Sequence, residues 1–143
     1  MKWWLVGILA VSLIWPWPAI ALDLQGLYEQ ALNASRSGDF VQALPLWDRV
    51  LEQSPQDAAA LSNRGNVRLA LGDLDGAIED QTLSIALAPE EADPHLNRGT
   101  AEEALQDWSA AAADYLWILE RQPDDASAPV SYTHLRAHET HEH

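Results

Sequence analysis

The sequence predicts an all-α protein, a solenoid of helix-turn-helix repeats in which three units stack on one another. Prolines recur at equal steps along the chain, at Pro55, Pro89 and Pro123. The same step separates three alanines and three aspartates, which are Ala43, Ala77, Ala111, Asp39, Asp73 and Asp107. A fixed period of about 34 residues indicates supersecondary units that bury their apolar faces against their neighbours.

Each unit is expected to hold two helices joined by a tight turn. In residues 58–91, apolar and small residues recur at helical spacing on both sides of Gly72-Asp73. Glycine tolerates the positive φ that often follows a helix, and aspartate caps the next helix by accepting backbone N–H bonds. Pro89 then ends the second helix, since proline cannot continue one. The units are expected to span residues 24–57, 58–91 and 92–125.

Two further positions follow the same period. Ala31, Gly65 and Gly99 are small residues midway along the first helices, and we expect them to let the paired helices approach closely. The third turn carries Gln106 where the other turns have glycine, which predicts strain or a different cap at that turn.

This pattern resembles the tetratricopeptide repeat, a 34-residue helix pair, over residues 24–125. The resemblance implies a right-handed superhelix whose concave face is lined by first helices. It departs from the usual pattern at His95, where a leucine or aromatic residue is common, and at Gln81, where an aromatic residue is common. The middle unit is therefore expected to bury less apolar surface than its neighbours.

The resemblance also implies a non-enzymatic function, which is to bind a partner segment in the concave groove and to scaffold or assist assembly of a complex. Asn63, Asn66 and Asn97 look similar to the asparagines that hold peptides in chaperone-binding members, although they could instead hydrogen-bond within the stack. The candidate groove residues are Tyr28, Glu29, Asn63, Asn66, Leu69, Asn97, Thr100 and Glu103. Lys2 is the only lysine, so a clamp for a terminal carboxylate is not expected.

Arginine recurs in the triplets Asn63-Arg64-Gly65 and Asn97-Arg98-Gly99. We expect Arg64 and Arg98 to bury their stems against a neighbouring helix and to pair with an acid at the rim, a structural role. Most other acids, Glu79, Asp80 and Glu91 among them, are interpreted as a solvated surface.

The N-terminus has the pattern of a secretory signal peptide over residues 1–21. An apolar run follows Lys2, and Ala19-Ile20-Ala21 supplies the small residues of a cleavage site after Ala21. Resemblance to repeat proteins of photosynthetic bacteria places the exported domain, residues 22–125, in the periplasm or thylakoid lumen. The alternative is an uncleaved leader that anchors a membrane-tethered scaffold.

Composition narrows the class of partner. The formal net charge is −14, and a chain of this charge repels nucleic acid and anionic lipid. The chain has no cysteine, and no nucleophile–base arrangement, phosphate loop or cofactor motif is visible. The predicted partner is a protein or peptide, contact with a membrane is expected only through an uncleaved leader, and no cofactor is expected.

The C-terminal residues 126–143 leave the repeat pattern and hold four of the five histidines. The string resembles translated adapter sequence, and we interpret it as disordered or artefactual. The alternative function is a metal-binding accessory protein that uses His134 and His138, which stand four residues apart. The interpretation of this segment as disordered or artefactual is favoured, so no metal site is predicted.

Overall fold

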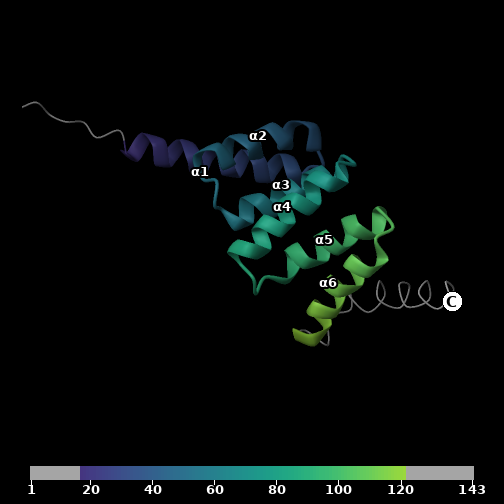
Figure 1. Ribbon diagram of the computed structural model, residues 1–143. Coiled ribbons are helices and arrows are strands. Elements are labelled where there is room, and N and C mark those ends of the chain that lie inside the picture. The colour runs from purple at the N-terminus through teal and green to yellow at the C-terminus, as the bar shows by residue number, and fades with distance from the viewer. Residues whose placement is uncertain (1–16, 122–143) are drawn as a thin grey trace, which may run out of the picture.

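The computed structural model describes residues 17–121, with side chains from residue 23 onward, and within them the protein is an all-α solenoid (Figure 1). The helices are α1 (Trp17–Arg36), α2 (Phe40–Gln53), α3 (Ala58–Ala70), α4 (Leu74–Leu87), α5 (Ala92–Ala104) and α6 (Trp108–Arg121). This confirms the predicted fold class. The histidine-rich tail and most of the predicted signal peptide lie outside the described residues.

The first helix begins earlier than the repeat period indicates. α1 starts at Trp17, ahead of residue 24, and continues through the predicted cleavage position after Ala21. Pro18 lies within the described part of α1 and does not end this helix. None of the described helices combines the length and hydropathy needed to cross a membrane.

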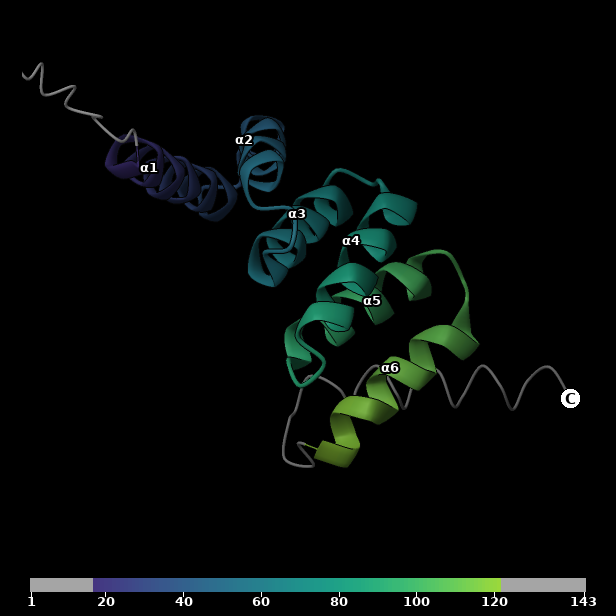
Figure 2. The ribbon, with the colours of Figure 1, turned by 60° about the vertical axis from the view of Figure 1, so that its left-hand side comes forward.

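The helices pack in pairs along the chain. α1 packs on α2, α3 on α4 and α5 on α6, while α2–α3 and α4–α5 contacts join one pair to the next. The first helices also contact one another, because α3 touches both α1 and α5. Figure 2 shows this succession from α1 to α6 along the molecule. One face of the stack is therefore formed by α1, α3 and α5.

The turns within the pairs follow one design. Gly38 and Gly72 have φ of +77° and +82°, and Gln106 reaches the same left-handed region at +64°. Asp39, Asp73 and Asp107 then cap α2, α4 and α6 by accepting backbone N–H bonds from the residue three positions on. The third turn thus keeps its cap, and the departure from glycine appears as backbone strain at Gln106.

The apolar core is divided in two. One cluster surrounds Trp47 in the first two pairs, and a smaller one surrounds Tyr115 and Ile118 in the third. Between them α4 buries polar side chains, namely Asp80, Gln81 and Ser84. The expectation that the middle unit buries less apolar surface than both neighbours stays a prediction.

The small residues in the first helices have the expected purpose. A Cβ atom on Gly65 would lie 2.7 Å from Gln81 Nε2, and one on Gly99 would lie 2.8 Å from Tyr115 Cε1. Ala31, at the equivalent position of the first unit, is fully buried. The close approach of the paired helices at these three positions therefore depends on a small residue in the first helix.

Candidate functional site

A pocket opens where α3, the end of α4 and the start of α5 meet, with a cavity volume of about 390 Å³. Small residues on α3 and at the end of α4 leave this space unfilled. We call it the α3–α4–α5 pocket. Its lining residues are Ala58, Ala59, Ser62, Asn63, Asn66, Ser84, Ala88, Glu91, Asp93 and Pro94.

Two of the predicted groove residues meet in this pocket. Asn63 and Asn66 are three residues apart on α3, so they lie on the same helix face. Asn66 Oδ1 accepts a hydrogen bond of 3.0 Å from Gln81 Nε2, which also donates to the Ser62 carbonyl at 3.0 Å. The amide N–H groups of exposed Asn66 have no partner among the described residues and remain donors for a ligand. Asn66 can thus hydrogen-bond within the stack and toward the pocket at once.

The wall contributed by α5 is acidic. Glu91 stands at the N-cap of α5 but makes no side-chain cap hydrogen bond. By contrast Asp57, at the equivalent position of the preceding repeat, accepts a 2.9 Å bond from the Ala60 N–H at the start of α3. Asp93 lies in the first turn of α5. The ten lining residues include two carboxylates and no lysine, arginine or histidine.

Tyr28 and Glu29 lie on α1, away from the pocket. Tyr28 packs edge-on against Trp47, with ring centroids 4.9 Å apart. Burial and the nearby Asp57 carboxylate raise the pKa of the Tyr28 hydroxyl, and a hydrogen bond with Asn63 opposes this rise. Glu29 is exposed and accepts a hydrogen bond from Gln25 within the same helix.

The other candidates lie along the same first helices without lining the pocket. Thr100 donates to the Leu96 carbonyl within α5, and Glu103 accepts a 3.0 Å bond from the Tyr115 hydroxyl. Leu69 and Asn97 are half-buried. Of the eight predicted groove residues, the structure brings Asn63 and Asn66 into one cavity.

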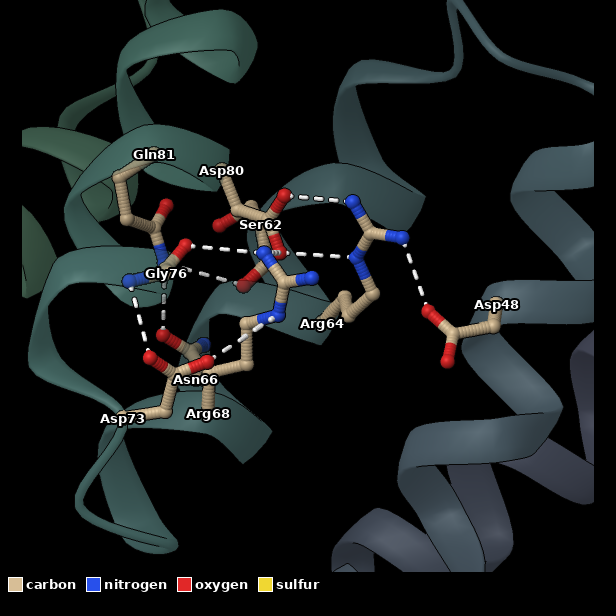
Figure 3. Close-up of polar contacts among 9 residues, drawn as sticks. All are labelled: Asp48, Ser62, Arg64, Asn66, Arg68, Asp73, Gly76, Asp80 and Gln81. Atoms are coloured by element: carbon tan, nitrogen blue, oxygen red, sulfur yellow. Dashed lines mark hydrogen bonds and ion pairs between the residues drawn. The ribbon is translucent and has the colours of Figure 1, made fainter.

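On α3, Arg64 lies in a partly buried ionic network (Figure 3). Its guanidinium makes two bonds of 2.8 and 2.7 Å to Asp80 and one of 2.9 Å to Asp48 on α2. These hydrogen bonds, the one to Asp80 foremost, raise the pKa of Arg64. Arg68 reaches the same Asp80 at 3.1 Å. Asp80 is fully buried, so its assignment to a solvated surface was wrong.

The third unit repeats the arginine–aspartate pair with different neighbours. Arg98 makes two 2.7 Å bonds to Asp114, and its Nη1 also bonds Thr82 on α4. The structural role predicted for the two arginines is thus present. Asp80 and Asp114 are buried and not at the rim, whereas Asp48, the second partner of Arg64, is 46% exposed. The recurring 16-residue spacing from Arg64 to Asp80 and from Arg98 to Asp114 is a sequence signal that would have indicated this.

Glu102 occupies the position in the third unit that Arg68 occupies in the second. Burial, and then the charge of Asp114, raise the pKa of Glu102 to about 7, although Arg98 partly offsets this. Its Oε2 is buried without a hydrogen-bond partner in the described chain. His95 also contacts Asp114, with Nδ1 2.7 Å from Oδ1, and stacks on Trp117 at a centroid distance of 3.8 Å.

Sequence reasoning missed the two acids of the pocket wall. Glu91 belongs to the acids interpreted as solvated surface, and Asp93 was not singled out. A signal existed, because Glu91 replaces the capping Asp57 in the repeat period. Within residues 17–121 no group of three or more His, Cys, Asp or Glu side chains could hold a metal ion.

Comparison with known proteins agrees with the helical repeat fold. Residues 28–92 match the family model described as tetratricopeptide repeat. Tetratricopeptide repeat protein 36 of Danio rerio is 32% identical over 71 residues, which cover 50% of this chain and 38% of that protein. The chain therefore matches well under half the length of this curated relative.

Solved structures extend the likeness over most of the described helices. The TPR domain of Arabidopsis OM64 gives a TM-score of 0.77 at 25% identity and covers 80% of this chain and 95% of that chain. The first TPR of Spaghetti (RPAP3), bound to the HSP90 peptide SRMEEVD, gives 0.78 at 22% identity and covers 82% and 93%. This fold is generally a protein-interaction scaffold and not an enzyme. The described part of the chain is an all-α helical repeat solenoid, similar in fold to these TPR domains.

Proposed function

We propose that this protein binds an extended segment of a partner protein in the α3–α4–α5 pocket and so scaffolds or assists assembly of a complex. The observation that carries the proposal is the pocket itself, lined by Asn63 and Asn66 on one face of α3. Asparagine amides offer a donor and an acceptor each, which suits the N–H and C=O groups of a peptide backbone. Pockets of this size with a few convergent polar groups are typical ligand sites.

The partner segment is not an acidic C-terminus of the kind bound by the RPAP3 neighbour. Arg64 and Arg68 are engaged by Asp80, and Arg98 by Asp114, inside the stack. The pocket itself carries carboxylates and no basic residue. A terminal carboxylate would therefore meet repulsion here without a cation to receive it.

The proposal extends to the cellular setting. An exported domain in the periplasm or thylakoid lumen, released after Ala21, fits the apolar run and the small residues of the leader. A net charge of −14 disfavours nucleic acid as a partner. The intact mass of the exported protein tests the setting, since cleavage leaves Leu22 at the N-terminus and an anchored scaffold retains Met1.

A substitution at Ala59 tests the binding function. Ala59 is exposed and lines the pocket, and Ala59→Arg fills the opening with a good helix former. Peptides selected on the full chain from a display library of random twelve-residue peptides should bind this variant at least tenfold more weakly in fluorescence anisotropy. The matched control is Ala113→Arg, an exposed alanine on α6, which should bind like the unmodified chain. Equal affinity of both variants for the selected peptides would contradict the proposal.

A further inference from the structure

We infer that the α3–α4–α5 pocket prefers a partner segment that carries a lysine or arginine side chain. The inference rests on the proposed function and names the chemistry of its partner. It follows from the charged side chains that line the cavity, from the arginines that are paired elsewhere in the fold, and from the polar groups that are free to bind a ligand.

Two carboxylates face the cavity without an internal cation. Glu91 and Asp93 are both exposed and line the pocket. In the described part of the chain neither forms an ion pair, and Arg121 pairs with Glu90 and Glu120. Glu91 also makes no cap hydrogen bond to its own helix. Both side chains are therefore available to a ligand.

The opposing charge at this wall is small. The N-terminus of α5 contributes a positive dipole end of roughly half an elementary charge. Pro94, in its first turn, supplies no N–H. Two full negative charges outweigh this dipole, so the pocket has a negative potential and attracts a cation.

The arginines carried by the helices that form the pocket are held elsewhere in the stack. Arg64 and Arg68 converge on buried Asp80, at 2.7 and 3.1 Å. Arg98 is held by Asp114 at 2.7 Å. Moving any of these arginines to the pocket would strand a buried aspartate, which is a large cost. A basic side chain from another molecule is the charge that the pocket can accept.

The polar residues of α3 give such a ligand its orientation. The donors of Asn66 and the amide of Asn63 lie on the wall formed by α3, and the carboxylates lie on the wall formed by α5. A segment could thus hydrogen-bond its backbone to the asparagines while a lysine or arginine reaches Glu91 and Asp93. The hydrogen bonds between the basic side chain and the two carboxylates are charge-assisted, so they are stronger than the neutral bonds to the asparagine amides.

The experiment compares selections on matched variants of the full chain. A display library of random twelve-residue peptides is selected on the unmodified chain, on Glu91→Gln/Asp93→Asn, and on the control Glu52→Gln/Glu79→Gln. The control removes the same charge from exposed positions on α2 and α4 that do not line the pocket. The readout is the combined frequency of lysine and arginine in bound peptides relative to the input library.

We expect lysine and arginine to be enriched severalfold on the unmodified chain and on the control, and to return to the input frequency on the pocket variant. Affinity of a selected peptide should also fall about three- to tenfold on the pocket variant and on raising salt from 50 to 500 mM. Pocket-dependent binding without basic enrichment would overturn the inference and leave the proposed function standing. If the unmodified chain selects peptides no better than Ala59→Arg does, both the inference and the proposed function are overturned.

Discussion

At the scale of single residues, two side chains hold unfavourable positions that the rest of the fold maintains. Gln106 adopts a φ of +64°, which glycine occupies in the other two turns. Glu102 places a carboxylate beside Asp114, where the second unit has an arginine. Both residues are departures from the repeat period, and both are open to test.

Replacing Gln106 with glycine should stabilise the fold. Glycine adopts the left-handed conformation without a Cβ clash, and the change should raise the free energy of unfolding by about 0.5–1 kcal/mol. Urea unfolding followed by circular dichroism measures this. The reverse substitution, Gly72→Gln at φ +82°, should cost a similar amount. A destabilising Gln106→Gly would show that the turn is not strained.

Replacing Glu102 with glutamine should change how stability depends on pH. The pKa of Glu102 is about 7 in the folded chain, above its ordinary value of 4.5. Between these values the folded state binds more protons, so the stability from this group is present below pH 4.5 and lost as pH rises through 7.

Glu102→Gln should therefore exceed the unmodified chain in stability at pH 8, by on the order of 1 kcal/mol after solvent screening, and by less at pH 5. Thermal unfolding at the two pH values measures the difference. The exposed Glu120→Gln serves as control and should give the same offset at both. A difference in stability between Glu102→Gln and the unmodified chain that does not change with pH would contradict the raised pKa.

At the scale of helices, Arg64 and Arg98 each join the two helices of their own unit to the unit before it. Arg64 joins α3 to α4 through Asp80 and to α2 of the preceding unit through Asp48. Arg98 repeats this with Asp114 and Thr82. The first unit has Gln30 and Leu46 at the equivalent positions, and its core is the apolar cluster around Trp47. The ionic layer thus separates the two apolar clusters.

The two aspartates that hold Arg64 should differ greatly in importance. Asp80→Asn removes the charge between Arg64 and Arg68 inside the stack, which should cost about 3 kcal/mol. Asp48→Asn breaks a pair whose acid is 46% exposed, and should cost less than about 1 kcal/mol. Urea unfolding of both variants gives the comparison. Equal losses would mean that Asp80 is not the centre of the network.

At the scale of the whole molecule, the repeat period predicted the path of the chain. The Gly72-Asp73 turn, the caps and the small residues lie where the period indicates, because each is a local requirement that recurs once in every repeat. The extension of α1 ahead of residue 24 was missed because the repeat period does not include those residues. The burial of Asp80 was missed because its arginine partners lie on another helix.

The candidate site was predictable only in part. Asn63 and Asn66 were named from the resemblance to peptide-binding repeats, and the structure places both in the α3–α4–α5 pocket. Glu91 and Asp93 were not predicted because the pocket requires three helices from two units to meet. The spatial relation of α3 to α5 is a property of the stack and not of either segment.

The central claim is that a partner segment binds in the α3–α4–α5 pocket. The most direct measurement is a ¹H–¹⁵N NMR titration of the full chain with a selected twelve-residue peptide. We expect saturable shifts at the side-chain amides of Asn63 and Asn66 and the backbone amides of Ala59, Glu91 and Asp93, all of which line the pocket. Saturable shifts confined to α2 and α6, with these five residues unchanged, would contradict it.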